Sequence, residues 1–377
     1  MRIGFDAKRA FNNHTGLGNY SRFIIEALLK YAPQHEYLAY TPKPPRDNKA
    51  GLKLSPKLPT TLVGGGLWRS WLINNDLKKD NVDIFHGLSN EIPFGIRKVG
   101  VKSVVTIHDL IFVRYPELYP AIDRFFYQQK FRYACQNADA VVAVSQQTKD
   151  DIMEFYKIPA ERIRVIYQDC QSIFFPSATL REQPSTGTPA AMLRELLGED
   201  ILKKYSLNRP YIICVSSFSE RKNQKRLVEA FQQLGLNDYE LVLVGGKSKY
   251  AEEIAQNSPQ NTRILYGVPS ADLPALYQGA SLCVYPSFFE GFGIPIVEAL
   301  HSGIPVVAAT GSCLEEAGGE GALYANPLDV NDLSDKMRQV LTNDLLRAEL
   351  ILKGKEHIKQ FSAENIAGQL VQLYKEL

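Results

Sequence analysis

Two successive series of short apolar runs constrain the fold of this chain, because polar segments with helical periodicity separate the runs. The first series is RIGFDA, EYLAYT, DIFHG, SVVTIHDL, AVVAVS and RIRVIY. The second series is YIICVSS, YELVLVGG, TRILYG, ASLCVYPS, IPVVAAT and ALYANP. Short runs that are apolar throughout are typical of parallel strands buried on both faces. The sequence therefore predicts an α/β protein with two Rossmann-like, doubly wound domains.

A stretch rich in proline, serine, threonine and glycine separates the two series, and we predict a linker or excursion there, at 176–205. The first domain is then expected over 1–175 and the second over 206–359. The amphipathic last helix, at about 360–377, could pack on either domain, including back on the first. Ligands bind outside the carboxyl ends of parallel strands, so we expect the functional residues in strand-to-helix loops that face a central cleft.

The composition excludes several classes of protein. A formal charge of +2, with acids and bases interspersed, does not indicate nucleic-acid binding. The five cysteines are widely spaced and contain no CxxC pair, which indicates neither a zinc site nor a disulfide framework and fits a reducing cytoplasm. No run of eighteen apolar residues occurs, so we expect a cytoplasmic protein that is at most peripheral to the inner membrane face.

One local region, from Lys43 to Lys79, carries a marked excess of basic residues. A solvated basic loop region is the simpler interpretation. The alternative is a docking face for an acidic partner or anionic lipid, which Trp68 and Trp71 beside Arg69 would support.

The stretch FFEGFGIPIVEAL combines two acids, Glu290 and Glu298, with two glycines, Gly291 and Gly293, at the expected start of a helix. The glycines allow the backbone to approach a ligand, and a helix N-terminus favours phosphate. A carboxylate accepts hydrogen bonds from two vicinal hydroxyl groups, so the two acids could hold sugar rings on either side of a phosphate. This pattern indicates a nucleotide sugar. The alternative is that the acids only complement the helix dipole.

The first domain offers two histidines at expected strand ends. VVTIHDL places His108 and Asp109 there, where an imidazole can orient a hydroxyl group or shuttle a proton, although a structural histidine is the alternative. FHGLSN places His86 similarly, and a structural role is slightly favoured for it. In NHTGLGNYSRF, Gly16 and Gly18 permit a tight turn close to a ligand, but the third glycine of a dinucleotide motif is missing, so NAD binding is poorly supported.

The stretch PSFFEGFGIPIVEALHSGIPVVAA resembles the E-x7-E region of retaining glycosyltransferases of the GT-B fold, in particular family 4. GVPSADLPALYQGASLCVYPS before it and GALYANPLDVNDL after it resemble the nucleotide-sugar domain of the same family in order and spacing. The similarity continues through VSSFSERKNQKRLVEAF, VTIHDL and AVVAVSQQTKDDI, so it covers most of both domains. Such a composite is far more specific than one glycine loop. It implies a GT-B fold and the transfer of a hexose from a nucleoside diphosphate sugar with retention.

The resemblance assigns roles in the second domain, the expected nucleotide-sugar domain. Glu290 would bind hydroxyl groups of the transferred sugar, and Glu298 would bind the ribose. Lys222 would bind the diphosphate, with Arg221 as its basic neighbour, which suits a leaving group that gains negative charge. An exposed lysine at a helix start is the alternative for Lys222. The donor loop completes the set, and its members are Gly291, Phe292, Gly293 and Ile294.

The resemblance also assigns roles in the first domain, the expected acceptor domain. His108 would contact the transferred sugar near its 6-hydroxyl, and with Glu290 and Lys222 it forms the predicted catalytic set. The loop with Gly16 and Gly18 would lie across the donor diphosphate. The candidates for acceptor contact are Asp6, Tyr20 and Asp109.

The sequence departs from the family pattern at one point. Many members carry an arginine just after the strand that precedes Lys222, whereas this chain has Ser216 and Ser217. Diphosphate binding would then depend more on Lys222 and the helix N-terminus. No D-x-D element stands at a strand end, so we expect no cofactor and no metal requirement.

The sequence indicates the substrates less specifically than it indicates the reaction. TIHDLIFVRYPELYP resembles bacterial mannosyltransferases of polysaccharide assembly, which favours GDP-mannose, with UDP-glucose and UDP-GlcNAc as open alternatives. A glycan or a lipid-linked glycan is the expected acceptor. A GT-B nucleotide-sugar epimerase and a non-catalytic nucleotide-sugar-binding protein are the remaining alternatives, but the presence of both Glu290 and His108 argues for an enzyme.

Overall fold

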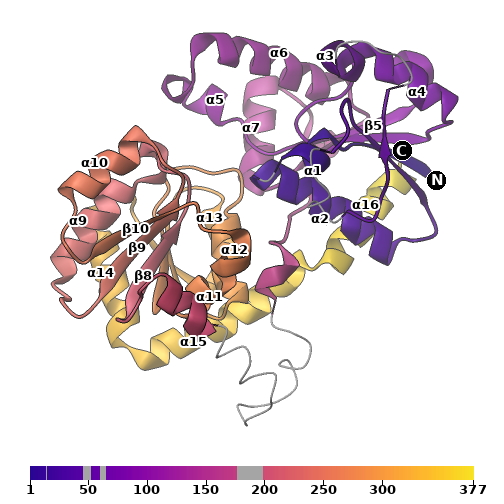
Figure 1. Cartoon of the computed structure of the whole chain (residues 1–377). Coiled ribbons are helices and arrows are strands. Elements are labelled where there is room, and N and C mark those ends of the chain that lie inside the picture. The colour runs from indigo at the N-terminus through magenta and orange to yellow at the C-terminus, as the bar shows by residue number, and fades with distance from the viewer. Residues whose placement is uncertain (14, 46–51, 60–64, 176–197) are drawn as a thin grey trace. The chain divides into compact units, whose positions relative to one another are not determined.

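The computed structural model describes residues 1–13, 15–45, 52–59, 65–175 and 198–377 (Figure 1). The chain divides into two compact units. Unit 1 comprises Met1–Asp169 together with Gln360–Leu377, and unit 2 comprises Cys170–Lys359. Unit 1 therefore ends at Asp169 rather than at the predicted 175. Most of the predicted linker, 176–197, lies outside the described residues.

Unit 1 is built on a seven-stranded sheet with the order β3-β2-β1-β4-β5-β6-β7, in which all neighbouring strands are parallel. Its strands are β1 Arg2–Asp6, β2 Glu36–Tyr40, β3 Pro56–Lys57, β4 Ile84–Gly87, β5 Lys102–Ile107, β6 Ala140–Ala143 and β7 Ile163–Val165. The strand order changes direction between β1 and β4, which pair through Ile3 and Ile84. This position is the topological switch point of the sheet.

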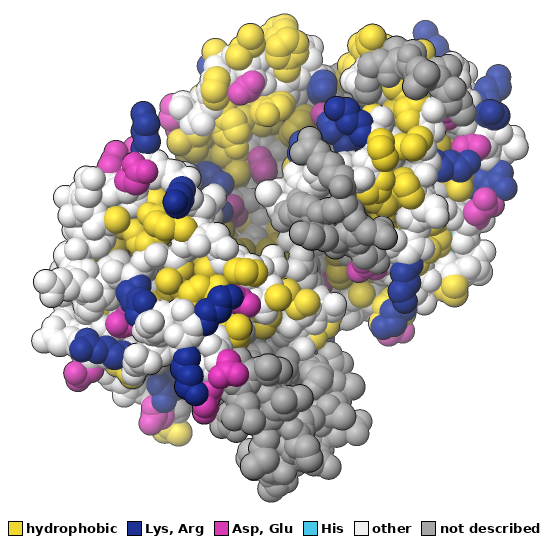
Figure 2. Space-filling model, viewed as in Figure 1, with side chains coloured by type: hydrophobic (Ala, Val, Ile, Leu, Met, Phe, Trp, Pro, Cys, Tyr) yellow, Lys and Arg dark blue, Asp and Glu magenta, His cyan; other side chains and the backbone are white. Residues whose placement is uncertain are grey.

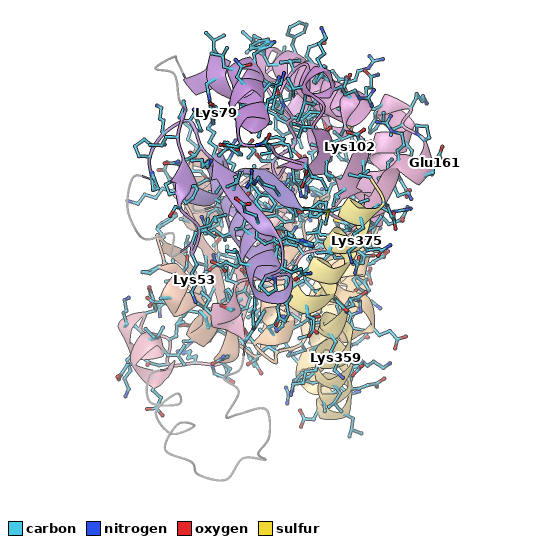
Figure 3. All side chains as sticks on the ribbon, turned by 90° about the vertical axis from the view of Figure 1, so that its right-hand side faces the viewer. Lys53, Lys79, Lys102, Glu161, Lys359 and Lys375 are labelled. Atoms are coloured by element: carbon cyan, nitrogen blue, oxygen red, sulfur yellow. The ribbon has the colours of Figure 1, made fainter. Side chains whose placement is uncertain are left out.

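Apart from the C-terminal helix, the helices of unit 1 lie between consecutive strands of the sheet. They are α1 Lys8–Asn12, α2 Gly16–Tyr31, α3 Gly65–Leu67, α4 Ile73–Lys79, α5 Ile111–Arg114, α6 Ala121–Asn137, α7 Gln146–Tyr156 and α16 Ala363–Lys375, with a π-helical turn at Trp68–Leu72. The C-terminal helix α16, which ends at Lys375 (Figure 3), packs against α2, and its Ile366, Leu370 and Tyr374 are buried. The sequence left open on which domain this helix packs, and the structure places it in the first.

Unit 2 repeats this architecture with a six-stranded parallel sheet of order β10-β9-β8-β11-β12-β13. Its strands are β8 Tyr211–Val215, β9 Glu240–Gly245, β10 Thr262–Tyr266, β11 Leu282–Tyr285, β12 Val306–Ala309 and β13 Ala322–Ala325. Its helices are α9 Gln224–Leu234, α10 Lys249–Asn257, α11 Leu273–Gln278, α12 Ile294–His301, α13 Leu314–Gly318, α14 Val330–Thr342 and α15 Asp344–His357. Every apolar run of the second series contains one of these strands.

The predicted class is confirmed, since two doubly wound parallel sheets form the two units. All five cysteine side chains are buried, and none of them forms a disulfide. Among the described residues, no helix has both the length and the apolar character needed to cross a bilayer. The central cleft that the sequence predicts between the two domains stays a prediction.

Candidate functional site

The loop between β11 and α12 in unit 2 has the sharp turn that its glycines predict. Gly293 adopts a φ of 126°, and a Cβ added there would lie 3.0 Å from Leu314 Cδ2 and 3.1 Å from Ala317 Cβ. Both the conformation and the close approach require glycine. Pro295 follows in the first helical turn, where its missing N–H costs nothing. The buried Cys313 thiol lies 3.1 Å from the carbonyl oxygens of Glu290 and Phe292 and holds the loop in place.

Glu290 lies at the centre of a buried polar cluster in this loop. Its Oε1 accepts hydrogen bonds from Lys222 Nζ at 2.5 Å and from Ser287 Oγ at 2.5 Å, and Tyr285 OH lies 3.2 Å away. Its Oε2 pairs with Arg221 Nη1 at 2.8 Å. Burial by itself would raise the pKa of Glu290, but the two cations and these hydrogen bonds outweigh it and lower the pKa to about 2. Glu290 is therefore ionised at neutral pH.

Lys222 retains hydrogen-bonding capacity in this cluster. An ammonium group has three N–H donors, and Lys222 Nζ gives one to Glu290 and one to Tyr285 OH, at 2.7 Å. Within the described residues no third acceptor contacts it. Two cations and one carboxylate leave the cluster with one net positive charge. The arrangement can bind an anion without losing its internal order.

The turn that carries these cations is fixed to the glycine loop by backbone contacts. Arg221 and Lys222 end a short 3-10 turn, Glu220–Lys222, before Asn223 adopts a left-handed φ of 61°. The Asn223 side chain donates to the carbonyl oxygens of Pro286 at 3.1 Å and Pro327 at 2.8 Å. Arg221 Nη1 also donates to Phe289 O. The turn with Arg221 and Lys222 and the glycine loop therefore form one pre-ordered unit. The sequence did not predict this contact, because the two motifs lie far apart in the chain.

Glu298 differs from Glu290 in having no ion pair with a cation among the described residues. It lies on α12, keeps some solvent contact, and accepts one hydrogen bond, from Tyr277 OH at 3.0 Å. Burial raises its pKa to about 7, and the hydrogen bond from Tyr277 only partly opposes this. Glu298 is thus a carboxyl group that is half ionised near neutral pH. Its remaining acceptor capacity suits vicinal hydroxyl groups.

In unit 1, His108 lies directly after β5 and is buried against the ring edge of Tyr20, with ring centroids 4.5 Å apart and planes at 89°. Its Nε2 lies 2.9 Å from the carbonyl oxygen of Leu88, so Nε2 carries the proton and donates it there. Nδ1, which has no partner among the described residues, is then an acceptor. Burial lowers the pKa of His108 to about 4, and Arg9 lowers it further against the opposing effect of Leu88. The ring is therefore neutral.

His86 occupies the interior rather than a ligand-facing position. Its Nδ1 lies 2.6 Å from Tyr374 OH on α16 and its Nε2 lies 2.8 Å from Thr106 Oγ1. Tyr20 OH lies 3.0 Å from the same Thr106 oxygen. Burial lowers the pKa of His86 to about 3. Both ring nitrogens are thus used to join β4, β5 and α16, which is a structural role.

The remaining residues predicted in unit 1 have differing environments. Gly18 is required, because a Cβ there would lie 1.8 Å from Asn13 O, whereas an added Cβ at Gly16 meets no atom within 4 Å. Tyr20 is buried under His108 and does not offer its hydroxyl to the surface. Asp109 Oδ1 accepts from Ile111 N at 3.1 Å and shapes the following turn.

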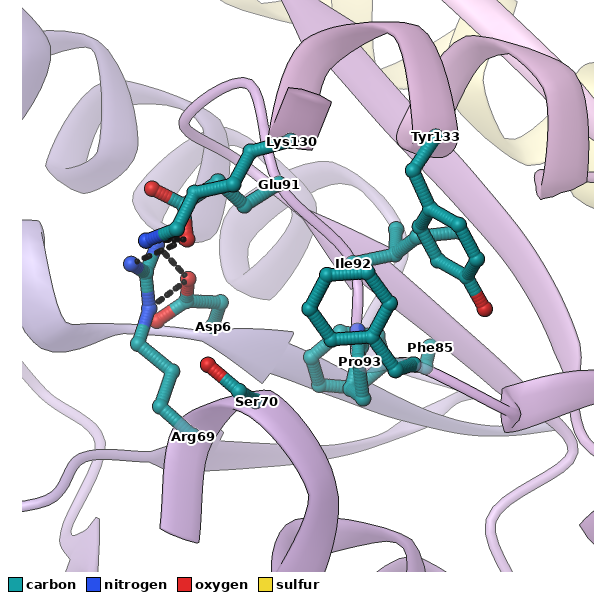
Figure 4. Close-up of a pocket in the computed structure, with 10 residues that line it drawn as sticks. Asp6, Arg69, Ser70, Phe85, Glu91, Ile92, Pro93, Lys130 and Tyr133 are labelled. Atoms are coloured by element: carbon teal, nitrogen blue, oxygen red, sulfur yellow. Dashed lines mark hydrogen bonds and ion pairs between the residues drawn. The ribbon is translucent and has the colours of Figure 1, made fainter. Parts of the chain in front are cut away.

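Asp6, the third acceptor candidate, is already engaged by a cation. Arg69 Nη2 lies 2.5 Å from Asp6 Oδ2, and Arg69 Nη1 lies 2.8 Å from Glu91 Oε2 (Figure 4). Lys130 Nζ extends the network to Glu91 at 3.2 Å. Burial would lower the pKa of Arg69, but Asp6 and Glu91 raise it above its ordinary value. Asp6 can therefore reach a ligand only if it shares or gives up this pairing.

Only one of the two tryptophans in the basic segment from Lys43 to Lys79 has an exposed side chain. Trp68 is buried and donates from Nε1 to Asp76 Oδ2 at 2.7 Å, and Arg69 lies in the network of Figure 4. Trp71 is half exposed and stacks on Phe94 at 4.9 Å. Two basic residues of the segment, Arg46 and Lys49, lie outside the described residues.

Several residues that contact Glu290, Glu298 or Asp6 were not predicted from the sequence. Tyr285 and Ser287 could have been found, because Tyr285 ends β11 and Ser287 follows it two residues later, immediately before the glycine loop. Tyr277 lies one helix earlier in the chain, and Arg69 lies far from Asp6 in sequence, so no local pattern indicates either pairing.

Each of the two units matches a known family model. Residues 199–357 match the family model described as glycosyl transferases group 1, and residues 15–168 match that of glycosyltransferase family 4. The O-antigen chain mannosyltransferase B of Escherichia coli is 32% identical over 304 residues, which cover 78% of this chain and 74% of that protein. The serotype-specific mannosyltransferase WbdA of Escherichia coli is 28% identical over 319 residues, but the match covers 36% of its length.

Solved structures show the same fold across the whole chain. The sucrose-phosphate synthase of Thermosynechococcus elongatus superposes with a TM-score of 0.75 at 21% identity, covering 100% of this chain and 98% of that one. Agreement at this level of identity concerns the fold alone, and it is the GT-B fold that the sequence resemblance implied.

Proposed function

We propose that this chain, which belongs to the group 1 glycosyltransferases of family 4, transfers mannose from GDP-mannose to a glycan or lipid-linked acceptor. The transfer would proceed with retention at the anomeric carbon. That it is a glycosyltransferase follows from the family. The observation that carries the proposed role of the site is the pre-ordered cluster around Glu290, in which Lys222 keeps a donor for a ligand. The mannosyltransferase relatives support the donor sugar.

The cluster suits the departure of a nucleoside diphosphate. The bond between the anomeric carbon and the phosphate oxygen breaks, and the diphosphate gains negative charge as it leaves. Lys222 and Arg221 lie where a net positive charge already exists, and their positions are fixed before the reaction, so little reorganisation is needed. We propose that these two side chains take the role that a divalent metal would otherwise have, so that transfer is independent of metal.

The two glutamates take different parts of the donor. Glu290 is ionised and can share its oxygens with hydroxyl groups of the transferred sugar, while Lys222 turns toward phosphate. Glu298 would accept hydrogen bonds from the ribose hydroxyl groups, which favour the ionised form of the carboxyl. Donor binding would therefore shift the pKa of Glu298 downward from about 7.

His108 is proposed to position a sugar hydroxyl rather than to act as a base. A pKa of about 4 makes it a weak base at neutral pH, but the neutral ring offers Nδ1 as a fixed acceptor. The acceptor hydroxyl would then lose its proton to the departing phosphate oxygen. Its oxygen forms the new bond on the face that the phosphate leaves, which gives retention. A double displacement would need a carboxylate nucleophile at the anomeric carbon, and the cations that hold Glu290 make it a poor one.

We also propose a peripheral contact with the inner membrane face, through α6 rather than through the two tryptophans. Large exposed hydrophobic side chains gather on this helix and the turn before it (Figure 2), and they are Leu118, Ile122, Phe125, Phe126 and Tyr127. Ile122, Phe125 and Phe126 have the spacing of one helix face. Exposed apolar side chains of this size on a helix are typical of membrane or protein contacts.

Flotation with vesicles of anionic lipid tests the membrane contact. The wild type is expected to float, and replacement of Phe125 and Phe126 by serine is expected to abolish flotation. Leu352→Ser removes an equally exposed side chain from unit 2 and serves as the matched control. A wild type that stays at the bottom of the gradient, or a double variant that still floats, contradicts this part of the proposal.

The transfer itself is tested by incubating the protein with GDP-mannose, UDP-glucose or UDP-GlcNAc in EDTA, with and without an alkyl mannoside or a lipid-linked oligosaccharide. We expect an acceptor-dependent product from GDP-mannose alone, with an α-anomeric proton in its NMR spectrum. A product from a UDP-sugar would overturn the choice of donor. An altered nucleotide sugar in the absence of acceptor would indicate an epimerase, and a β-linked product would exclude retention.

A further inference from the structure

Two cations stand immediately after β1, at the topological switch point of unit 1. Lys8 and Arg9 follow Asp6 by two and three residues, and β1 lies between β2 and β4 where the strand order changes direction. In open α/β sheets this crevice is the usual place for a ligand. None of the roles proposed above uses either residue.

Neither side chain makes a hydrogen bond or an ion pair in the part of the chain that the structure describes. The backbone N–H of Lys8 donates to Asp6 Oδ1 at 3.3 Å. Both side chains are only partly exposed. In contrast, two other partly buried arginines of unit 1 are fully engaged: Arg22 donates to Ala10 O and Asn13 O, each at 2.8 Å, and Arg69 pairs with Asp6 and Glu91.

The neighbouring carboxylates cannot neutralise these two cations, because Arg69 already occupies them. Arg69 lies against both Asp6 and Glu91, and Lys130 adds a second cation to Glu91 (Figure 4). Burial lowers the pKa of Lys8, repulsion from Arg69 and Arg9 lowers it further, and attraction to Asp6 and Glu91 only partly opposes this. Arg9 also lowers the pKa of His108. The end of β1 therefore has an excess of positive charge that its own acids do not balance.

We propose that Lys8 and Arg9 form a binding site for a phosphate or diphosphate group of the acceptor. An anion there would relieve the repulsion among the cations and satisfy N–H donors that otherwise face only water. The donor diphosphate has its own cations in Lys222 and Arg221, which leaves the acceptor as the source of a second anion. This inference rests on the proposed function, since it takes the ligand to be the substrate that receives the sugar. Two acceptors share this chemistry, a lipid diphosphate and a phosphorylated sugar.

Calorimetric titration of inorganic pyrophosphate into the GDP-saturated protein tests the site. We expect one further equivalent of pyrophosphate to bind, and we expect Lys8→Gln and Arg9→Gln each to weaken it about tenfold, as the loss of one charge-assisted hydrogen bond predicts. Lys98→Gln, which removes an exposed lysine of the same unit, is expected to leave it unchanged. Competition by geranyl diphosphate or by mannose 6-phosphate then distinguishes the two kinds of acceptor.

The outcomes separate this inference from the proposed function. If no pyrophosphate binds to the GDP-saturated protein, the acceptor site is overturned while GDP binding stands. The same holds if pyrophosphate binds but neither substitution weakens its binding. If GDP itself fails to bind, the proposed function fails, and the same titration without GDP, in the Lys222→Gln background, still decides whether Lys8 and Arg9 bind pyrophosphate. Loss of GDP affinity in Lys8→Gln or Arg9→Gln would assign the pair to the donor and contradict the inference.

Discussion

Both units carry candidate functional residues at the carboxyl ends of parallel strands, but the residues after β11 of unit 2 are charged and those after β5 of unit 1 are neutral. After β11 in unit 2, Glu290, Lys222 and Arg221 form a buried ionic cluster. After β5 in unit 1, His108 and Tyr20 form a neutral pair in which burial keeps the imidazole uncharged. The fold therefore supplies the position, and the local residues decide whether it suits a charged or a hydroxylated part of a ligand.

The largest difference between the units is expected when the charge is removed from unit 2. Glu290→Gln leaves Lys222 and Arg221 without their counter-ion, and breaking a buried ion pair typically costs about 3–5 kcal/mol. We expect a lower midpoint in chemical unfolding and loss of transfer by about 100-fold or more, as for other groups that hold a charged transition state. The matched control is Glu253→Gln, which removes an exposed partner of Lys225 and is expected to change the stability by less than about 1 kcal/mol. Equal effects of both substitutions would mean that the buried cluster around Glu290 contributes no more to stability than an exposed ion pair.

The pH dependence of stability sharpens the comparison within unit 2. Because the pKa of Glu298 is raised to about 7 in the folded protein, its carboxyl binds a proton that the unfolded chain releases near pH 4.5. Its contribution to stability is therefore present below that pH and is lost as the pH rises through 7, a change of about 3 kcal/mol at 1.36 kcal/mol per unit. The pKa of Glu290 is depressed instead, so its contribution is constant above about pH 5 and is lost at lower pH.

Unfolding experiments at pH 5 and pH 8 on the wild type and Glu298→Gln isolate this effect. The glutamine keeps an acceptor for Tyr277 but cannot ionise. We expect the wild type to lose stability relative to the variant between the two pH values. A constant difference would mean that Glu298 has an ordinary pKa and is not the neutral counterpart of Glu290.

A glycine pair in unit 1 tests whether its helix start is as tightly built as that of unit 2. Gly18→Ala places a Cβ 1.8 Å from Asn13 O, so the turn must shift, at a cost of about 1–3 kcal/mol. Gly16→Ala meets no atom within 4 Å and is expected to leave stability unchanged. Thermal unfolding of the two variants gives the comparison directly, and equal midpoints would mean that the turn is not constrained.

The smallest effect is expected at the neutral pair of unit 1. Tyr20→Phe removes a hydroxyl whose partner Thr106 still contacts His86, so a loss of about 1 kcal/mol is expected. Since the pKa of His108 is about 4, the rate of transfer should show no titration of this histidine between pH 6 and 8. A rate that falls with a midpoint near 6.5 in the wild type, and that loses this midpoint in His108→Gln, would show instead that His108 is exposed and ordinary.

The sequence predicted the two sheets and the sharp turn of the glycine loop, because these depend on local periodicity and on residues adjacent in the chain. The roles of Glu290 and Glu298 stay predictions. The sequence did not predict the pairing of Arg69 with Asp6 or of Tyr277 with Glu298, which join segments that are distant in sequence. Composition also misled at Trp68 and Arg69: a basic, tryptophan-containing segment resembles a surface, but an internal carboxylate accounts for each of them. Charge in a sequence is thus informative about function only once its partners are known.

The central claim is that Lys222, held by Glu290, binds the diphosphate of the donor. The most direct test is the thermal shift that GDP produces in EDTA on the wild type, Lys222→Gln and Lys225→Gln, the last being an exposed lysine three residues away. At 100 times its dissociation constant GDP should stabilise the wild type and Lys225→Gln by about 2.7 kcal/mol, and it should stabilise Lys222→Gln much less. An equal shift in all three proteins, or no shift in any of them, would contradict the account.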